Sequence, residues 1–173
     1  LSLKSNENVK KLTRLIKYIR QVSNTKIGIQ LSHSGRKGSA MVPWIKSNSP
    51  LRIGKQGWQT IAPSPIRRDK HWPEPKEANK NDIKIIVNNF ALAAERAKKI
   101  GFDCLEIHMA HGYLLHQFFS PISNKASHYF LHRIASLYDH HISHSSYLDQ
   151  STVLLDRVFL YPCRMQGSVC IHP

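Results

Sequence analysis

In the first 125 residues, segments with helical spacing of hydrophobic residues alternate with short continuous hydrophobic runs. Between residues 6 and 22 they recur every three or four positions among lysines and arginines, which predicts an amphipathic helix. Residues 26–31 form a short apolar run that is typical of a fully buried strand in a parallel sheet. Helical spacing returns from residue 81 to residue 100, and residues 102–108 predict a second strand.

The second predicted helix has signals at both ends. Asn81 and Asp82 can cap its start, and Gly101 can end it because glycine readily adopts the left-handed conformation that often follows a helix. We expect one face of this helix to pack on the strands. That face consists of seven apolar residues, namely Ile83, Ile86, Val87, Phe90, Ala93, Ala94 and Ala97.

The order helix, strand, long loop, helix, strand predicts an α/β fold with a parallel sheet. Both predicted strands end in polar segments, and ligands of parallel α/β proteins bind at the carboxyl ends of strands. Residues 39–79 show no helical pattern and contain six prolines and three tryptophans, Trp44, Trp58 and Trp72. Loops of this length are usually functional, so the tryptophans could form a pocket wall. The alternative is an ordered structural excursion.

Chemically active side chains concentrate just after the second strand. His108, His111 and Tyr113 fall within six positions, with Gly112 between the last two. A strand that ends on histidines before a helical segment is typical of the active-site edge of a (β/α) barrel. Imidazole and phenol groups can polarise a carbonyl oxygen and deliver a proton. The alternative is that the histidines are structural groups.

The charge and the cysteines bear on function class and location. The net charge of +14 lies entirely in residues 1–125, which hold 22 Lys and Arg against 8 Asp and Glu. A basic nucleic-acid-binding module is therefore an alternative function, but the cations are dispersed rather than gathered in one stripe, and we expect no nucleic-acid partner. We see no eighteen-residue apolar run and no signal-peptide pattern, and expect a cytoplasmic protein without a membrane partner. The three cysteines lack the spacing of a metal site.

A histidine metal site is a further alternative. It would use His108, His111 and His116, or the histidines of the last 48 residues. The spacing of the first two is not the i, i+4 spacing of zinc hydrolases, and no H-E-x-x-H motif is present. We therefore expect no metal.

Three strings of residues resemble the old yellow enzyme family of FMN-dependent ene-reductases, particularly its bacterial NADPH dehydrogenases. They are K-I-G-I-Q-L-S-H-S-G-R-K at 26–37, G-W-Q-T-I-A-P-S-P-I at 57–66, and the string at 101–125 that contains H-x-x-H-x-Y. The resemblance covers about residues 1–125. It implies a partial (β/α)8 TIM barrel, in which 26–31 and 103–108 are about strands three and four.

The resemblance also implies roles for individual residues. Gln30 falls on the glutamine that hydrogen-bonds the isoalloxazine ring of FMN, a task that suits an amide because it can both donate and accept. His108 and His111 fall on the pair that binds the carbonyl oxygen of an α,β-unsaturated substrate. Tyr113 falls on the tyrosine that delivers a proton to the substrate α-carbon. The implied activity is reduction of a small enone-type molecule at its C=C bond, with NADPH or NADH as reductant.

The resemblance stops after Lys125, where the composition also changes. The last 48 residues contain no lysine, whereas the first 125 contain fifteen. We interpret residues 126–173 as an irregular non-family tail, either frameshifted or disordered. Because most strands of a barrel are missing and no initiator methionine is present, we expect a gene fragment that binds FMN weakly or not at all, and an inactive gene fragment is an alternative to the oxidoreductase function. The intact parent is expected to be a homo-oligomer.

Overall fold

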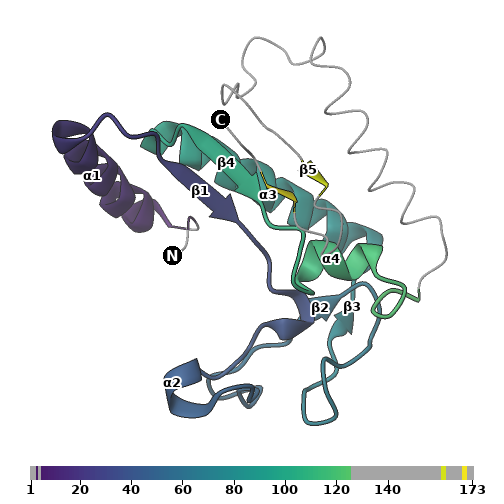
Figure 1. The fold of residues 1–173 in the computed structure, drawn as a ribbon. Helices are drawn as coiled ribbons and strands as arrows, with labels where there is room; N and C mark the ends of the chain where they lie inside the picture. Colours follow the sequence, from purple (N-terminus) through teal and green to yellow (C-terminus); the bar gives the residue numbers. More distant parts are fainter. Residues whose placement is uncertain (1–2, 4, 126–160, 163–168, 171–173) are drawn as a thin grey trace. The chain divides into compact units, whose positions relative to one another are not determined.

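The computed structural model describes residues 3, 5–125, 161–162 and 169–170 of the chain (Figure 1). These residues belong to two compact units. Of the described residues, 3, 5–31, 81–108, 161–162 and 169–170 belong to the sheet unit, and 32–80 and 109–125 belong to the loop unit. The predicted irregular tail lies outside the described residues, except for β5 (Tyr161–Pro162) and β6 (Val169–Cys170), which pair antiparallel.

The sheet unit begins with α1 (Asn6–Val22), which confirms the first predicted helix. The side chain of Ser5 caps it by accepting a hydrogen bond from the Asn8 N–H at 3.2 Å. Leu12 and Ile16 lie one turn apart on its apolar face and are buried against Ile100. The helical spacing therefore places the apolar residues on the face that packs against Ile100.

The two predicted strands of the sheet unit pair in parallel, as expected for an α/β fold. They are β1 (Gly28–Leu31) and β4 (Cys104–Ile107), and Gln30 stands opposite Glu106 in their register. The helix α3 (Lys80–Ile100) covers one face of the pair (Figure 1). Leu31, Ala97 and Leu105 form the buried core between this helix and the strands.

The prediction of a fully buried first strand is wrong. Gly28 and Gln30 are exposed, whereas Leu31 is buried. Side chains alternate between the two faces of a strand, and among the described residues α3 packs against one face of this pair. The other face is therefore a polar surface that carries Gln30 and Glu106.

The ends of α3 differ in part from the sequence prediction. The helix begins at Lys80, so Asn81 and Asp82 lie in its first turn instead of capping it. Gly101 follows its last residue with a φ of +100°, which confirms the predicted stop. Val87 was expected on the buried face but is 46% exposed, because two short strands are too narrow to cover the whole helix.

Asp103 ties the start of β4 to the rest of the sheet unit. Its carboxylate accepts the Ile27 N–H at 2.9 Å and forms ion pairs with Arg20 and Lys26. Burial alone would raise the pKa of Asp103, but the Ile27 N–H and the two cations outweigh it and lower the pKa to about 2. No pattern in the sequence indicates this contact.

The loop unit contains short elements joined by long connections. They are η1 (Gly35–Lys37), α2 (Pro43–Lys46), β2 (Ile61–Ala62), β3 (Lys76–Glu77) and α4 (Leu114–Phe119). The helix α4 packs against η1 and β2. The single turn α2 was not predicted, although proline suits its first position because the missing N–H would have no partner there.

The three tryptophans of the loop unit differ in burial. Trp72 is 2% exposed, and the Arg68 guanidinium lies 4.4 Å from the centre of its ring. Trp44 is 83% exposed and Trp58 is 55% exposed. The burial of Trp72 therefore fits an ordered structural loop better than an exposed pocket wall.

Candidate active site

The polar face of the sheet unit presents a side-chain amide in a fixed orientation. The Nε2 of Gln30 donates to Oε1 of Glu106 at 2.9 Å. Because a carboxylate can only accept, this contact determines which end of the amide faces Glu106. The amide oxygen of Gln30 makes no hydrogen bond to another described residue, so it can accept one from a ligand N–H.

This arrangement fits one edge of a flavin ring. Gln30 is exposed, its backbone is held in the parallel pair, and its free oxygen matches the N–H that an isoalloxazine edge offers. Glu106 was missed by the sequence analysis, although its position two residues before His108 places it on the same strand face.

His108 lies at the carboxyl end of β4. Its backbone N–H donates to the carbonyl of Leu31 at 2.9 Å, so the ends of the two parallel strands lie side by side. The residue is 8% exposed. Gln30 and His108 therefore occupy one end of the strand pair in the sheet unit.

His111 and Tyr113 belong to the loop unit, on the connection from β4 to α4. His111 is exposed and has a φ of +54°, and Gly112 follows with a φ of +68°. Two left-handed residues in succession reverse the chain sharply, and the conformation is strained for a histidine. Such strain is common at functional sites and persists when neighbouring contacts hold it.

Lys37 is one of these contacts. Its ammonium donates to the carbonyl of His111 and lies 5.8 Å from the centre of the Tyr113 ring, within cation–π range. Burial lowers the pKa of Lys37, and the positive charges of Arg68 and Arg36 lower it further. Lys37 is the last residue of the matched string at 26–37, but no sequence pattern indicated this role for it.

Gln117 is the second contact and is 1% exposed. Its Nε2 donates to the carbonyl of Gly112 at 2.7 Å, and its Oε1 accepts the Arg36 N–H at 3.3 Å. One buried amide thus joins the turn after β4 to the loop after β1. Gly35 makes room for it, because a Cβ at Gly35 would lie 2.4 Å from Oε1 of Gln117. Sequence spacing gave no signal for this role, since glutamine is common on exposed helix faces.

Two histidines near the turn act as hydrogen-bond acceptors. The Nδ1 of His116 accepts the Gly112 N–H at 2.7 Å, and the Nδ1 of His33 accepts the Gly35 N–H at 3.1 Å. Burial lowers the pKa of His33, which favours its neutral form. Among the described residues, no three His, Cys, Asp or Glu side chains are grouped so that they could hold a metal ion. The histidines of the tail lie outside this part of the chain.

A sequence model of the NADH:flavin oxidoreductase / NADH oxidase family matches residues 1–130. The chain belongs to this family. Membership in the NADH:flavin oxidoreductase / NADH oxidase family confirms the resemblance to the old yellow enzymes. The matched region contains Gln30, His108, His111 and Tyr113.

Two curated relatives illustrate the likeness. A protein of Gibberella zeae named NADH:flavin oxidoreductase is 50% identical over 103 residues, which are 58% of this chain and 25% of the relative. An NADPH dehydrogenase of Clostridium acetobutylicum is 42% identical over 124 residues, which are 72% of this chain and 32% of the relative. The chain therefore spans about a quarter to a third of the length of these family members.

A solved structure agrees with this assignment at the level of the fold. Morphinone reductase in complex with tetrahydroNAD matches with a TM-score of 0.62 and 20% identity, over 80% of this chain and 42% of that chain. An α/β fold with parallel strands is thereby confirmed. In the described part of the chain, no helix is long and apolar enough to cross a membrane.

Proposed function

We propose that the chain is part of an FMN-dependent oxidoreductase that reduces the C=C bond of α,β-unsaturated carbonyl compounds with NADPH or NADH. Family membership, the names of the NADPH dehydrogenase relatives and the tetrahydroNAD complex of morphinone reductase support this class. The observation that carries the proposal is the polar end of the β1–β4 pair. There the oriented amide of Gln30 and the buried His108 stand on adjacent strand ends.

We further propose that residues 1–125 form part of a (β/α)8 barrel, with β1 and β4 as its strands three and four. Residues 126–173 would then be a separate tail. In such a barrel the carboxyl ends of the strands carry the catalytic groups, which agrees with the positions of Gln30 and His108. A cytoplasmic location, a homo-oligomeric parent and the absence of a nucleic-acid partner stay predictions.

Gln30 is the residue proposed to hold the flavin ring. Its Nε2 donates a hydrogen bond to Glu106, so its oxygen would accept a hydrogen bond from the ring. When bound, FMN would supply the hydride-transfer chemistry that amino-acid side chains cannot provide. The side chains of the protein orient the reactants and stabilise charge.

His108 and His111 are proposed to donate hydrogen bonds to the carbonyl oxygen of the substrate. Negative charge develops on this oxygen as its conjugated double bond is reduced, so donors aimed at it lower the barrier. Tyr113 is proposed to deliver a proton to the substrate α-carbon. The contact of Lys37 with the His111 carbonyl and the Tyr113 ring would fix both residues on the same turn.

A chimera tests these roles. Residues 1–125 would replace the matched segment of the Clostridium acetobutylicum NADPH dehydrogenase, and stopped-flow absorbance would follow the two half-reactions separately. In this background His108→Ala should slow enone reduction by about 10²–10³-fold, the usual cost of losing one such donor. Reduction by NADPH should change less, because no substrate oxygen is polarised in that step.

Tyr113→Phe in the same chimera is the matched variant. It should retain hydride transfer to activated enones and slow the delivery of the proton to the α-carbon. If His108→Ala left both half-reactions unchanged in an active chimera, the histidine would be structural and the site assignment would be wrong.

A further inference from the structure

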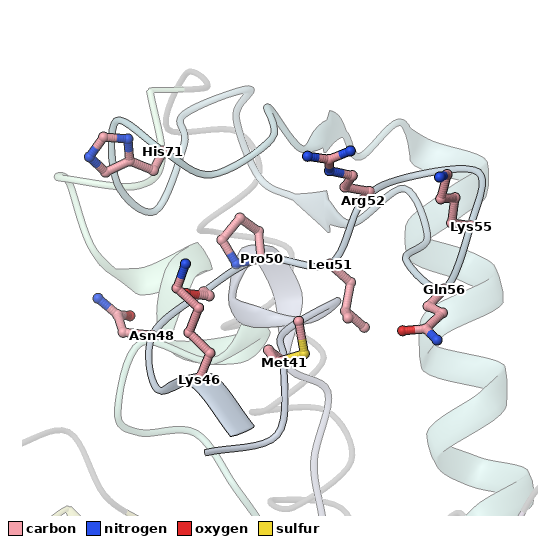
Figure 2. A pocket seen from close by; sticks show the side chains of 10 residues that line it. Met41, Lys46, Asn48, Pro50, Leu51, Arg52, Lys55, Gln56 and His71 are labelled. Carbon is pink, nitrogen blue, oxygen red and sulfur yellow. The ribbon is translucent and has the colours of Figure 1, made fainter. Parts of the chain in front are cut away.

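The loop unit contains an open cavity of about 840 Å³ between residues 41 and 56, with His71 at its edge. Its volume lies within the range of small-molecule sites, about 300–1,000 Å³. Figure 2 shows Lys46 and Asn48 on one side of Pro50 and Leu51, and Lys55 and Gln56 on the other. None of these residues belongs to the candidate active site.

The side chains around this cavity carry positive charge without a compensating negative one. Lys46, Arg52 and Lys55 line it, and no Asp or Glu does. Within the described part of the chain, none of these three side chains forms a hydrogen bond or an ion pair. Arg67 shows the contrast, because it lies 3.7 Å from Glu74 in the same unit. Three unpaired cations around one cavity favour an anionic ligand.

The floor of the cavity is apolar. Met41, Pro50 and Leu51 are half-buried and contribute thioether, ring and aliphatic carbon atoms. Methionine adapts its shape to flat ring systems because its side chain is flexible and polarisable. An apolar floor with a cationic rim suits a ligand that combines a planar base with phosphate groups.

The backbone around the cavity is held by hydrogen bonds. Ser39 is 2% exposed and has a φ of +56°; its carbonyl accepts the Leu51 N–H at 2.7 Å and its hydroxyl accepts the Trp58 N–H at 3.0 Å. The carbonyl of Arg52 accepts the Gly57 N–H at 3.0 Å. The loop is therefore built to a defined shape, which reduces the entropy lost when a ligand binds.

We propose that this cavity binds a phosphorylated nucleotide, with Lys46, Arg52 and Lys55 placed around its phosphate groups and Met41 and Leu51 against the base (Figure 2). The planar guanidinium of Arg52 can bind two phosphate oxygens at once, and the lysines add point charges. The ligand class is shared by NADPH, whose adenosine carries a 2′-phosphate, and by free nucleotides. The proposal does not rest on the ene-reductase function, since the cavity contains none of the residues assigned to it.

Calorimetric titration of the full chain at low salt tests the site. The probes are adenosine 2′,5′-bisphosphate, 5′-AMP and adenosine. We expect saturable one-to-one binding of both phosphorylated probes, and at least tenfold weaker binding of adenosine. If the bisphosphate binds more tightly than 5′-AMP, the natural ligand is a nucleotide with the 2′-phosphate of NADPH. If the two bind equally, the cavity is a general nucleotide site.

Variants then separate a local site from the general attraction of a chain with a net charge of +14. Arg52→Ala and Lys46→Gln should each weaken bisphosphate binding by about tenfold, because each removes a charge-assisted contact. Lys84→Ala is the matched control, since it removes one charge from an exposed position of α3 outside the cavity. It should change the affinity less than twofold.

Three results would overturn the proposal. The first is no saturable binding of either phosphorylated probe to the folded chain. The second is equal binding of adenosine, which would remove the phosphate from the recognition. The third is an equal loss of affinity in Lys84→Ala and Arg52→Ala, which would show non-specific attraction. Circular dichroism of each variant verifies that it is folded.

Discussion

The sheet unit and the loop unit are stabilised by different kinds of contact. In the sheet unit, Leu31, Ala97 and Leu105 form an apolar cluster beneath a parallel ladder of backbone hydrogen bonds. In the loop unit, buried polar side chains bond to backbone groups that have no regular partner, as Gln117 and Ser39 do. Apolar packing is tolerant of detail, whereas each buried hydrogen bond depends on one residue. We infer that single substitutions will disturb the geometry of His111 and Tyr113 more readily than the strand pair.

Gly35→Ala should have the largest effect on the loop unit. The residue has a φ of +56°, and an added Cβ would meet the buried carboxamide of Gln117 at 2.4 Å. The amide would have to move, and its bonds to Gly112 and Arg36 would be lost. Left-handed strain of about 1 kcal/mol and the lost bonds of a buried amide at about 2 kcal/mol predict a destabilisation of about 3 kcal/mol. Denaturant unfolding and amide exchange at Gly112 and Tyr113 measure it.

Gly54→Ala is the control for this substitution. Gly54 has a φ of +85°, but no atom lies within 4 Å of the position of an added Cβ. It should therefore cost about 1 kcal/mol from backbone strain alone and leave exchange at Tyr113 unchanged. If both variants lost equal stability, the packing of Gln117 on Gly35 would contribute nothing.

The sheet unit should lose stability in acid through Asp103. The pKa of this carboxyl is lowered from 3.8 to about 2 in the folded chain, so the stabilisation is complete above pH 4 and is lost as the pH falls towards 2. The difference corresponds to about 2 kcal/mol. Urea unfolding at pH 5 and at pH 2.5 should show this loss in addition to that of other carboxyl groups.

Asp103→Asn isolates the contribution. The variant should be less stable by about 2 kcal/mol at pH 5, and this difference should shrink to about 1 kcal/mol at pH 2.5, because the unfolded parent is then protonated and the folded parent begins to be. Asp69→Asn, at an exposed position of the loop unit, serves as the matched control. A constant difference between Asp103→Asn and the parent at both pH values would contradict the ion-pair explanation.

The sequence predicted the sheet unit better than the loop unit, for a physical reason. A helix or strand buries a repeating set of apolar residues, and this repeat placed α1, α3 and β4 close to their observed bounds. Residues 26–31 were wrongly expected to be fully buried, because an apolar run does not reveal whether one or both faces of the strand will be covered. Asp103 was missed because its partners, Arg20 and Lys26, are distant in sequence.

The sequence predicted the side chains of the candidate site but not the residues that hold them in position. The spacing of His108, His111 and Tyr113 singles them out, and their roles remain proposals. Lys37 and Gln117 act through the backbone carbonyls of the turn, and any residue has such a carbonyl. A contact to backbone leaves no pattern in one sequence, so these two residues became visible in the structure alone.

The smallest predicted effect concerns the orientation of Gln30. Glu106 can accept hydrogen bonds but cannot donate them, so the Nε2 of Gln30 faces it. In Glu106→Gln the partner can donate as well as accept, and the Gln30 amide can turn over at little cost. The contact is exposed to solvent, so stability should fall by less than about 1 kcal/mol. In the sheet unit this change affects a ligand contact without breaking the apolar core.

Nuclear magnetic resonance of the ¹⁵N-labelled side chain should show one bonded set of Gln30 NH₂ signals in the parent and exchange-averaged signals in the variant. Glu106→Ala removes the acceptor entirely and should give the signals of a solvent-exposed amide. Unchanged signals in both variants would show that Glu106 does not orient Gln30, and the proposed flavin contact would lose its geometric support.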